Sequence, residues 1–184
     1  MFFARLIEFV LPYVISMVHK REILNSRECV GRGRFIAHLV IRERKTKKPV
    51  VVALIGSTDS GKRLVVEGLA KQIGATIIWE NAIRAELQKQ GVHNKGVHAI
   101  AEDAAIEIVE KGGTVILNFN AIEMRDRAIL RAKARKAGVR LVFVRTYCEP
   151  ETEKPPCDVL ANINTKYEEY WIHEVGTFAK ELLA

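Results

Sequence analysis

Eight consecutive residues constrain the fold more than any others in the chain: Gly56, Ser57, Thr58, Asp59, Ser60, Gly61, Lys62 and Arg63. They fit the phosphate-binding pattern G-x-x-x-x-G-K-[ST] at every position except the last. The glycines let backbone N–H groups curl around a phosphate, and Lys62 would reach its outer oxygens. Arg63 stands where a Ser or Thr hydroxyl usually ligates Mg²⁺. The segment therefore predicts phosphate binding, but not ordinary magnesium-assisted transfer.

The sequence around this loop predicts an α/β fold. Residues 49–55 are an apolar, largely β-branched run typical of a buried parallel strand, and residues 64–73 have helical spacing. Further strands are predicted at 75–79, 114–117 and 139–144, and they alternate with helices predicted at 82–90, 97–111 and 122–136. Such repeats favour a three-layer, mostly parallel sheet with the loop strand central and helices on both faces.

The charge of the chain lies at one end. Of the net charge of +7, all comes from residues 1–48, while residues 49–184 are balanced. We therefore divide the chain into an N-terminal helical extension, 1–48, and a phosphate-binding domain, 49–184. The basic segment 20–48 predicts an acidic partner, either nucleic acid or an anionic membrane surface, with a solvated linker as the alternative. Within it, residues 26–33 are predicted as a loop and 35–41 as a helix, with a strand as the alternative.

Residues 2–18 are strongly apolar. They predict a helix that packs on the core or on a second copy of the chain, giving a homo-oligomer; the alternative is an interfacial membrane anchor. The three cysteines, Cys29, Cys148 and Cys157, are too widely spaced for a zinc site or a disulfide framework. We expect no metal site and a cytoplasmic location, with peripheral membrane attachment as the alternative.

Polar residues follow the second and third predicted strands, at 80–84 and 118–120. With the loop and the basic helix after the third strand, residues 49–147 resemble the P-loop kinases of small molecules and nucleic-acid ends. That group includes adenylylsulfate kinase, polynucleotide kinase and the zeta-toxin-like kinases. The resemblance implies a nucleotide ligand, ATP or another.

The same resemblance implies a set of site residues. In those kinases a D-x-h-R motif follows the second strand: its Asp is the general base and its Arg holds the substrate. Here these positions are Asn81 and Arg84, and the Asp that usually ends the third strand is Asn118. A family arginine on the next helix matches Arg127, with Arg125 and Arg131 nearby on that helix. The predicted catalytic positions are therefore Lys62, Asn81, Arg84 and Arg127.

The departures from the family pattern leave catalysis open. An amide cannot accept a proton or balance Mg²⁺, so magnesium is not expected and phosphotransfer is predicted to be impaired. One alternative is an active ATP-dependent phosphotransferase acting on a small molecule or a nucleic-acid end, with Glu80 or Asp59 as the base. Another is a structural module in which Arg63 fills the phosphate site. Ordinary surface roles are predicted for the remaining polar candidates, which are His93, His98, Glu102 and Asp103.

Overall fold

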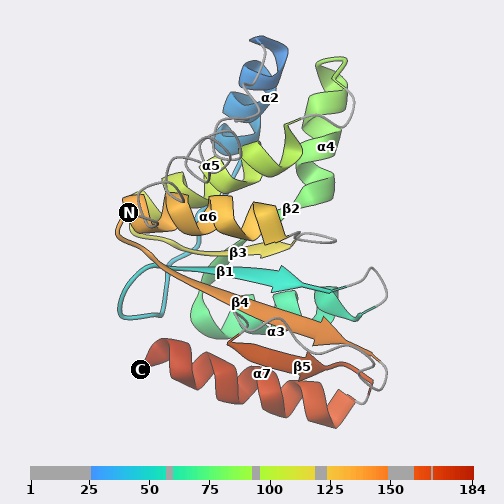
Figure 1. The fold of residues 1–184 in the computed structure, drawn as a ribbon, viewed down its shortest axis with the longest axis vertical. Helices are drawn as coiled ribbons and strands as arrows, with labels where there is room; N and C mark the ends of the chain where they lie inside the picture. The colour runs from blue at the N-terminus through green and yellow to red at the C-terminus, as the bar shows by residue number, and fades with distance from the viewer. Residues whose placement is uncertain (1–25, 57–59, 93–95, 119–123, 149–159, 167) are drawn as a thin grey trace, which may run out of the picture.

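The computed structural model describes residues 26–56, 60–92, 96–118, 124–148, 160–166 and 168–184. Its centre is a parallel sheet of five strands in the order β2-β3-β1-β4-β5 (Figure 1). The strands are β1 (Val50–Ile55), β2 (Ala75–Trp79), β3 (Thr114–Asn118), β4 (Arg140–Tyr147) and β5 (Ala161–Asn164). The strand before the loop is central, as predicted, because β1 pairs with β3 on one side and β4 on the other.

Helices cover both faces of the sheet (Figure 1). They are α2 (Ser26–Ala37), α3 (Lys62–Ile73), α4 (Glu80–Lys89), α5 (Val97–Glu110), α6 (Met124–Lys136) and α7 (Glu168–Leu183). The predicted alternation of strands and helices from residue 49 to 147 is confirmed, and α/β is the correct fold class.

Two apolar cores lie on opposite faces of the sheet. Because successive strand residues point to opposite sides, Val51 and Ala53 of β1 face α5 and α6, while Val52 and Leu54 face α3 and α7. All four side chains are fully buried. This double burial explains why β1 reads as a continuous apolar run rather than an alternating one.

The predicted loop at 26–33 is wrong, because these residues form most of helix α2. Gly31 does not end the helix; it allows α2 to approach α4 closely. A Cβ at Gly31 would lie 2.9 Å from Cδ2 of Leu87 on α4. Phe35, one turn further on, is buried in the same core. The helix predicted at 35–41 ends at Ala37, and the residues from there to β1 are irregular.

Two elements near the C-terminus complete the fold. Strand β5 pairs with β4 in parallel, and α7 packs on α3. The buried side of α7 is apolar and has helical spacing, with Val175, Phe178, Ala179 and Leu182. The apolar segment 2–18 and the residues 151–156 lie outside the described residues. Within the described residues, no helix has the length and apolar character needed to cross a bilayer.

Candidate functional site

The predicted phosphate-binding loop lies where β1 ends and α3 begins (Figure 1). Ser57, Thr58 and Asp59 are outside the described residues. Gly61 is the N-cap of α3 and has φ 67°, in the left-handed region that favours glycine. Glycine offers no side-chain cap, and the first N–H groups of a helix have no partner within the helix itself. A helix N-terminus that directly follows a strand is a favourable place for an anion.

Lys62 is held inside this loop. Its Nζ donates to the carbonyl oxygen of Gly56 at 2.7 Å, so the side chain folds back over the turn. The residue is only 4% exposed. Burial lowers the pKa of Lys62 to about 8, and the nearby carboxylate of Glu80 opposes part of that shift. The amine is therefore mostly protonated at pH 7 and is placed to meet a negative charge.

Three hydroxyl-bearing residues fix the far side of the loop. The Oγ of Ser60 shares a buried hydrogen bond of 2.7 Å with Oγ1 of Thr146 at the end of β4. The Oγ1 of Thr165, just after β5, donates to the Ser60 carbonyl at 2.8 Å. Sequence reasoning missed Thr146 and Thr165, because they join the loop from about a hundred residues away and match no local motif.

Glu80 and Arg84 form the next part of the site. Glu80 follows β2 directly and is 7% exposed, and Nε of Arg84 donates to its Oε1 at 2.9 Å. Asn81, the predicted base position, is exposed on α4 instead. The buried carboxylate is thus one residue earlier than the family motif places it. The spacing of four between Glu80 and Arg84 is a helical ion-pair signal already present in the sequence.

Asn118 ends β3 beside the loop strand, in register with Leu54 on one side and Trp79 on the other. Among the residues that the structure describes, its buried Oδ1 has no hydrogen-bond donor. Buried polar atoms of this kind are rare in folded proteins and call for a role. Its position at the carboxyl edge of the sheet places this acceptor at the same edge as Lys62 and Glu80.

Arg63 does not fill the phosphate site. Its Nε binds Oε1 of Glu67 at 2.9 Å, one turn further along α3, and its guanidinium lies 5.9 Å from the ring centre of Trp79. The side chain is 80% exposed. The alternative in which Arg63 replaces the phosphate is therefore wrong for this structure, because the i,i+4 partner Glu67 and the ring of Trp79 hold the arginine along the helix.

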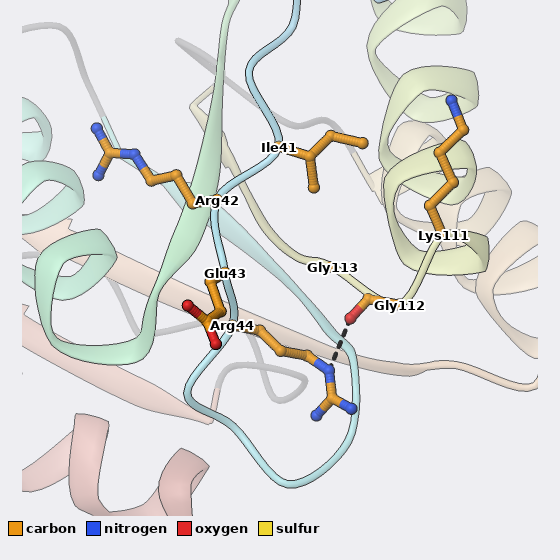
Figure 2. Close-up of a pocket in the computed structure, with 7 residues that line it drawn as sticks. All are labelled: Ile41, Arg42, Glu43, Arg44, Lys111, Gly112 and Gly113. Carbon is orange, nitrogen blue, oxygen red and sulfur yellow. Dashed lines mark hydrogen bonds between the residues drawn. The ribbon is translucent and has the colours of Figure 1, made fainter.

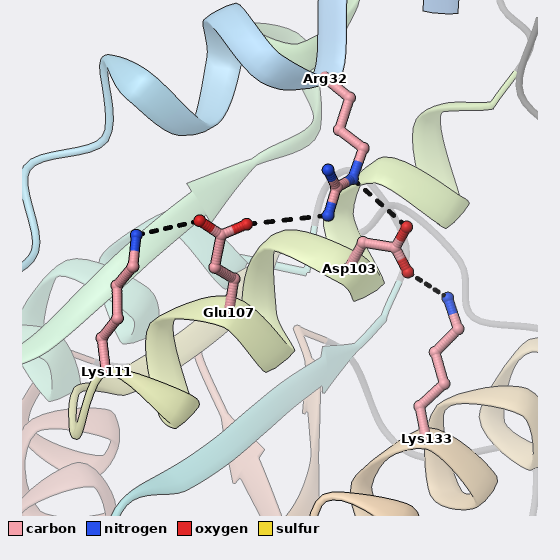
Figure 3. A network of polar contacts seen from close by, with 5 residues as sticks. All are labelled: Arg32, Asp103, Glu107, Lys111 and Lys133. Atoms are coloured by element: carbon pink, nitrogen blue, oxygen red, sulfur yellow. Dashed lines mark hydrogen bonds and ion pairs between the residues drawn. The ribbon is translucent and has the colours of Figure 1, made fainter. Parts of the chain in front are cut away.

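The carboxylates of α5 belong to a separate ion-pair network (Figure 3). Lys133 of α6 lies 2.8 Å from both Glu102 and Asp103, and Arg32 of α2 binds Asp103 and Glu107. Burial alone would lower the pKa of Lys133, but the two carboxylates outweigh it and raise the pKa. Burial raises the pKa of Glu102. These groups tie α2, α5 and α6 together. The surface role predicted for Glu102 is therefore wrong, because its carboxylate is buried beside Lys133, whereas Asp103 is partly exposed.

The remaining predicted residues lie on α5 and α6. His98 of α5 faces Asp126 of α6 at 3.4 Å, and Arg131 lies over the ring of Phe143 at 4.9 Å. Arg127 is half-buried on α6, and its approach to the loop stays a prediction. His93 is outside the described residues.

A shallow pocket of about 560 Å³ lies between the segment before β1 and the end of α5, at the opposite edge of the sheet from Lys62 (Figure 2). In it, Nε of Arg44 donates to the carbonyl oxygen of Gly112 at 2.7 Å. The Arg44 side chain therefore binds the backbone just after α5, and the pocket is not part of the phosphate site.

Comparison with solved structures places the fold in a known class. The protein APE1195 superposes with a TM-score of 0.62 at 14% identity, over 75% of this chain and 98% of its own. An APS kinase from Mycobacterium tuberculosis, solved with AMPPNP and APS, has a TM-score of 0.53 at 13% identity, over 73% and 95% of the two chains. A hexameric APS kinase from Thiobacillus denitrificans has a TM-score of 0.57 at 19% identity, over 75% of this chain and 29% of its own.

No family model matches the sequence, and no curated protein matches it. At these identities the structural likeness defines the fold alone. The chain has the fold of the P-loop kinases, with Gly56–Lys62 at the position where such a fold carries its phosphate-binding loop.

Proposed function

We propose that this protein binds the phosphates of a nucleotide, ATP or another, at the loop Gly56–Lys62, and that its phosphotransfer is impaired. The observation that carries the proposal is Lys62: a buried, mostly protonated amine held at the Gly56 carbonyl beside the N-terminus of α3. This arrangement suits an anion, since a protonated amine and a helix N-terminus both attract negative charge. The likeness to an APS kinase solved with AMPPNP adds support for a nucleotide.

The proposed impairment follows from three side chains. Arg63 carries no hydroxyl for Mg²⁺ and is turned along α3 toward Glu67. Asn81 and Asn118 occupy positions where the resembling kinases use carboxylates, and neither amide can accept a proton at neutral pH. A bound nucleotide would bring a transferable phosphoryl group to this edge. Lys62 would then bind the negative charge of that phosphoryl group, but Asn81 and Asn118 could not deprotonate the acceptor hydroxyl.

A specific observation favours a second candidate, an active phosphotransferase. Glu80 is a buried carboxylate one residue before Asn81, and it interacts with Lys62 and is bound by Arg84. In this alternative Glu80 takes the proton of the acceptor hydroxyl, and Arg84 holds the Glu80 carboxylate in place. General-base catalysis contributes typically 10²–10⁴-fold to a rate, so loss of this carboxylate would be measurable.

Calorimetric titration with ADP and ATP, with and without Mg²⁺, tests the binding proposal. We expect binding that changes little with Mg²⁺ and that is lost in Lys62→Met, while Lys71→Met, a matched change on the exposed side of the same helix, binds as the wild type does. Absence of binding in the wild type, or equal binding by both variants, would refute it.

A transfer assay with γ-labelled ATP over a panel of hydroxyl acceptors separates the two candidates. The impaired protein should show no transfer above the rate of ATP hydrolysis by water. Turnover that is lost in Glu80→Gln but retained in Asn81→Ala would establish the active phosphotransferase instead, with Glu80 as its base.

We further propose a cytoplasmic homo-oligomer, with the apolar segment 2–18 as the contact between copies. The support is the apolar sequence of that segment and the hexameric state of the similar APS kinase. Sedimentation equilibrium of the full chain tests this, and a monomer at all concentrations would rule it out.

A further inference from the structure

The edge of the sheet opposite the phosphate-binding loop is strongly basic. All five strands are parallel, so their amino ends meet there, together with the C-terminal ends of α3, α5, α6 and α7 (Figure 1). Exposed cationic residues on these segments define what we call the basic edge: Arg42, Lys45, Lys47, Lys48, Lys71, Lys111, Arg135, Lys136, Arg140 and Lys180. The exposed acidic residues on the same segments are only Glu43, Glu110 and Glu181.

The basic segment that leads into β1 is fixed on this edge rather than free in solvent. The backbone N–H of Arg42 donates to Oγ1 of Thr76 at 2.9 Å, and that of Lys45 donates to the Ile73 carbonyl at 2.9 Å. Further along, Oγ1 of Thr46 shares a buried hydrogen bond with a threonine at the start of β3. The solvated-linker interpretation of this segment is therefore wrong for residues 42–46, because their backbone is bonded to the sheet and to α3.

The charges of the basic edge are largely uncompensated. Lys111 pairs with Glu107, and Arg140 lies 3.8 Å from Glu181. The other eight basic residues make no ion pair within the described part of the chain. Lysines in the last turn of a helix stabilise its dipole, which accounts for Lys71 and Lys180. It does not account for Lys47 and Lys48, which lie in the irregular segment before β1.

Apolar residues beside the basic edge favour a membrane surface over other polyanions. Val40 is 81% exposed and Ile41 is 39% exposed, immediately before Arg42. Figure 2 shows Ile41 pointing toward the end of α5 that carries Lys111, so an apolar side chain sits among basic ones. Stable membrane attachment generally needs two signals, such as an apolar element plus a polybasic patch.

We propose that the basic edge docks the protein on an anionic membrane surface. Lys47 and Lys48 face the lipid headgroups, and the exposed side chain of Val40 enters the interface as the apolar signal. The phosphate-binding loop, at the opposite edge, then faces away from the bilayer. This proposal is independent of whether a nucleotide binds.

Vesicle co-sedimentation of the full chain tests the proposal, with phosphatidylcholine vesicles that contain or lack phosphatidylserine. We expect binding only to the anionic vesicles, and weaker binding as salt rises, because headgroup attraction is screened. The double variant Lys47→Gln/Lys48→Gln should bind on the order of 30-fold more weakly, since each cation near such a surface is worth about 1 kcal/mol. Both lysines are exposed, so folding should be unchanged, which circular dichroism checks.

The matched control is Arg27→Gln/Lys166→Gln, which removes the same charge elsewhere. Arg27 lies beside Gly91, past the end of α4, and Lys166 follows the carboxyl end of β5. We expect the control to bind as the wild type does. Equal loss in both variants, or equal binding to neutral vesicles, would overturn the proposal. Binding to duplex DNA that is tighter than to anionic vesicles at the same salt, and that depends on Lys47 and Lys48, would identify nucleic acid as the partner and overturn it as well.

Discussion

Replacing Gly61 by alanine should destabilise the protein far more than the same change at Gly138. Both glycines have nearly the same left-handed backbone, φ 67° at Gly61 and φ 66° at Gly138. Alanine in this region costs about 1–2 kcal/mol at either position. The surroundings differ, because a Cβ at Gly61 would lie 2.6 Å from Cβ of Thr165 and 2.7 Å from its Oγ1, whereas a Cβ at Gly138 has nothing within 4 Å.

The size of the difference follows from what Thr165 must give up. Both distances are too short for non-bonded atoms, so Thr165 has to move. Its hydroxyl contacts the carbonyls of Ser60 and Tyr147, and its N–H donates to Tyr147. A hydrogen bond contributes about 1 kcal/mol net, so losing the hydroxyl bond and the N–H bond adds about 2 kcal/mol. We expect a total of about 3–4 kcal/mol for Gly61→Ala, against about 1–2 kcal/mol for Gly138→Ala.

Urea unfolding followed by circular dichroism measures both variants against the wild type. The double variant Gly61→Ala/Thr165→Gly is the decisive control, because it removes the Thr165 side chain that clashes. Its loss should be smaller than the two single losses added together. Equal losses for Gly61→Ala and Gly138→Ala, with simple additivity in the double variant, would show that Thr165 does not hold the loop.

Three further predictions concern charged and polar groups. ADP affinity measured by calorimetry should fall as pH rises above about 8, because phosphate binding favours protonated Lys62 and the pKa of Lys62 without ligand is about 8. An affinity that stays constant through this pH range would show that the Lys62 amine does not lose its charge there. Lys133→Met should lower the free energy of unfolding by about 2–3 kcal/mol at pH 7 by leaving Glu102 without its cation, and the loss should shrink in acid as that carboxyl takes up a proton, whereas a constant loss would argue against the pairing. Asn118→Leu should stabilise the fold by about 1 kcal/mol, since it removes a buried acceptor that lacks a donor, and should weaken ADP binding; a destabilised variant with full binding would contradict a ligand role.

The strands were predictable because burial on both faces leaves a local signal. In β1, Val50 to Leu54 are all buried, so the run is apolar throughout. Strand β5 left no such signal: it lies at the sheet edge, and of its four residues only Ile163 is buried. Helix α7, by contrast, carries a helical apolar period at Val175, Phe178 and Leu182, so a helix here is predictable from the sequence.

The site was predictable only where its residues are local. The loop from Gly56 to Lys62 is a single contiguous motif, and the structure places it between strand and helix as expected. Thr165 could not be found this way, because its link to Ser60 depends on where β5 and α7 lie in the finished fold. The direction of the Arg63 side chain likewise depends on Trp79, which lies at the end of β2. Long-range packing, rather than residue type, decides these contacts.

Glu80 is the group that most clearly separates binding from catalysis. Its carboxylate lies near Lys62 and therefore also near any phosphate that Lys62 holds, where like charges repel. In a protein that only binds nucleotide, removing that charge in Glu80→Gln should tighten ADP binding, because the repulsion is lost while the Gln amide retains a carbonyl acceptor for Arg84. In a phosphotransferase that uses Glu80 as its base, the same change would also tighten binding but would remove turnover. A Glu80→Gln protein that binds ADP more weakly than the wild type would contradict both, and would show that Glu80 acts mainly by holding Arg84 against the ligand.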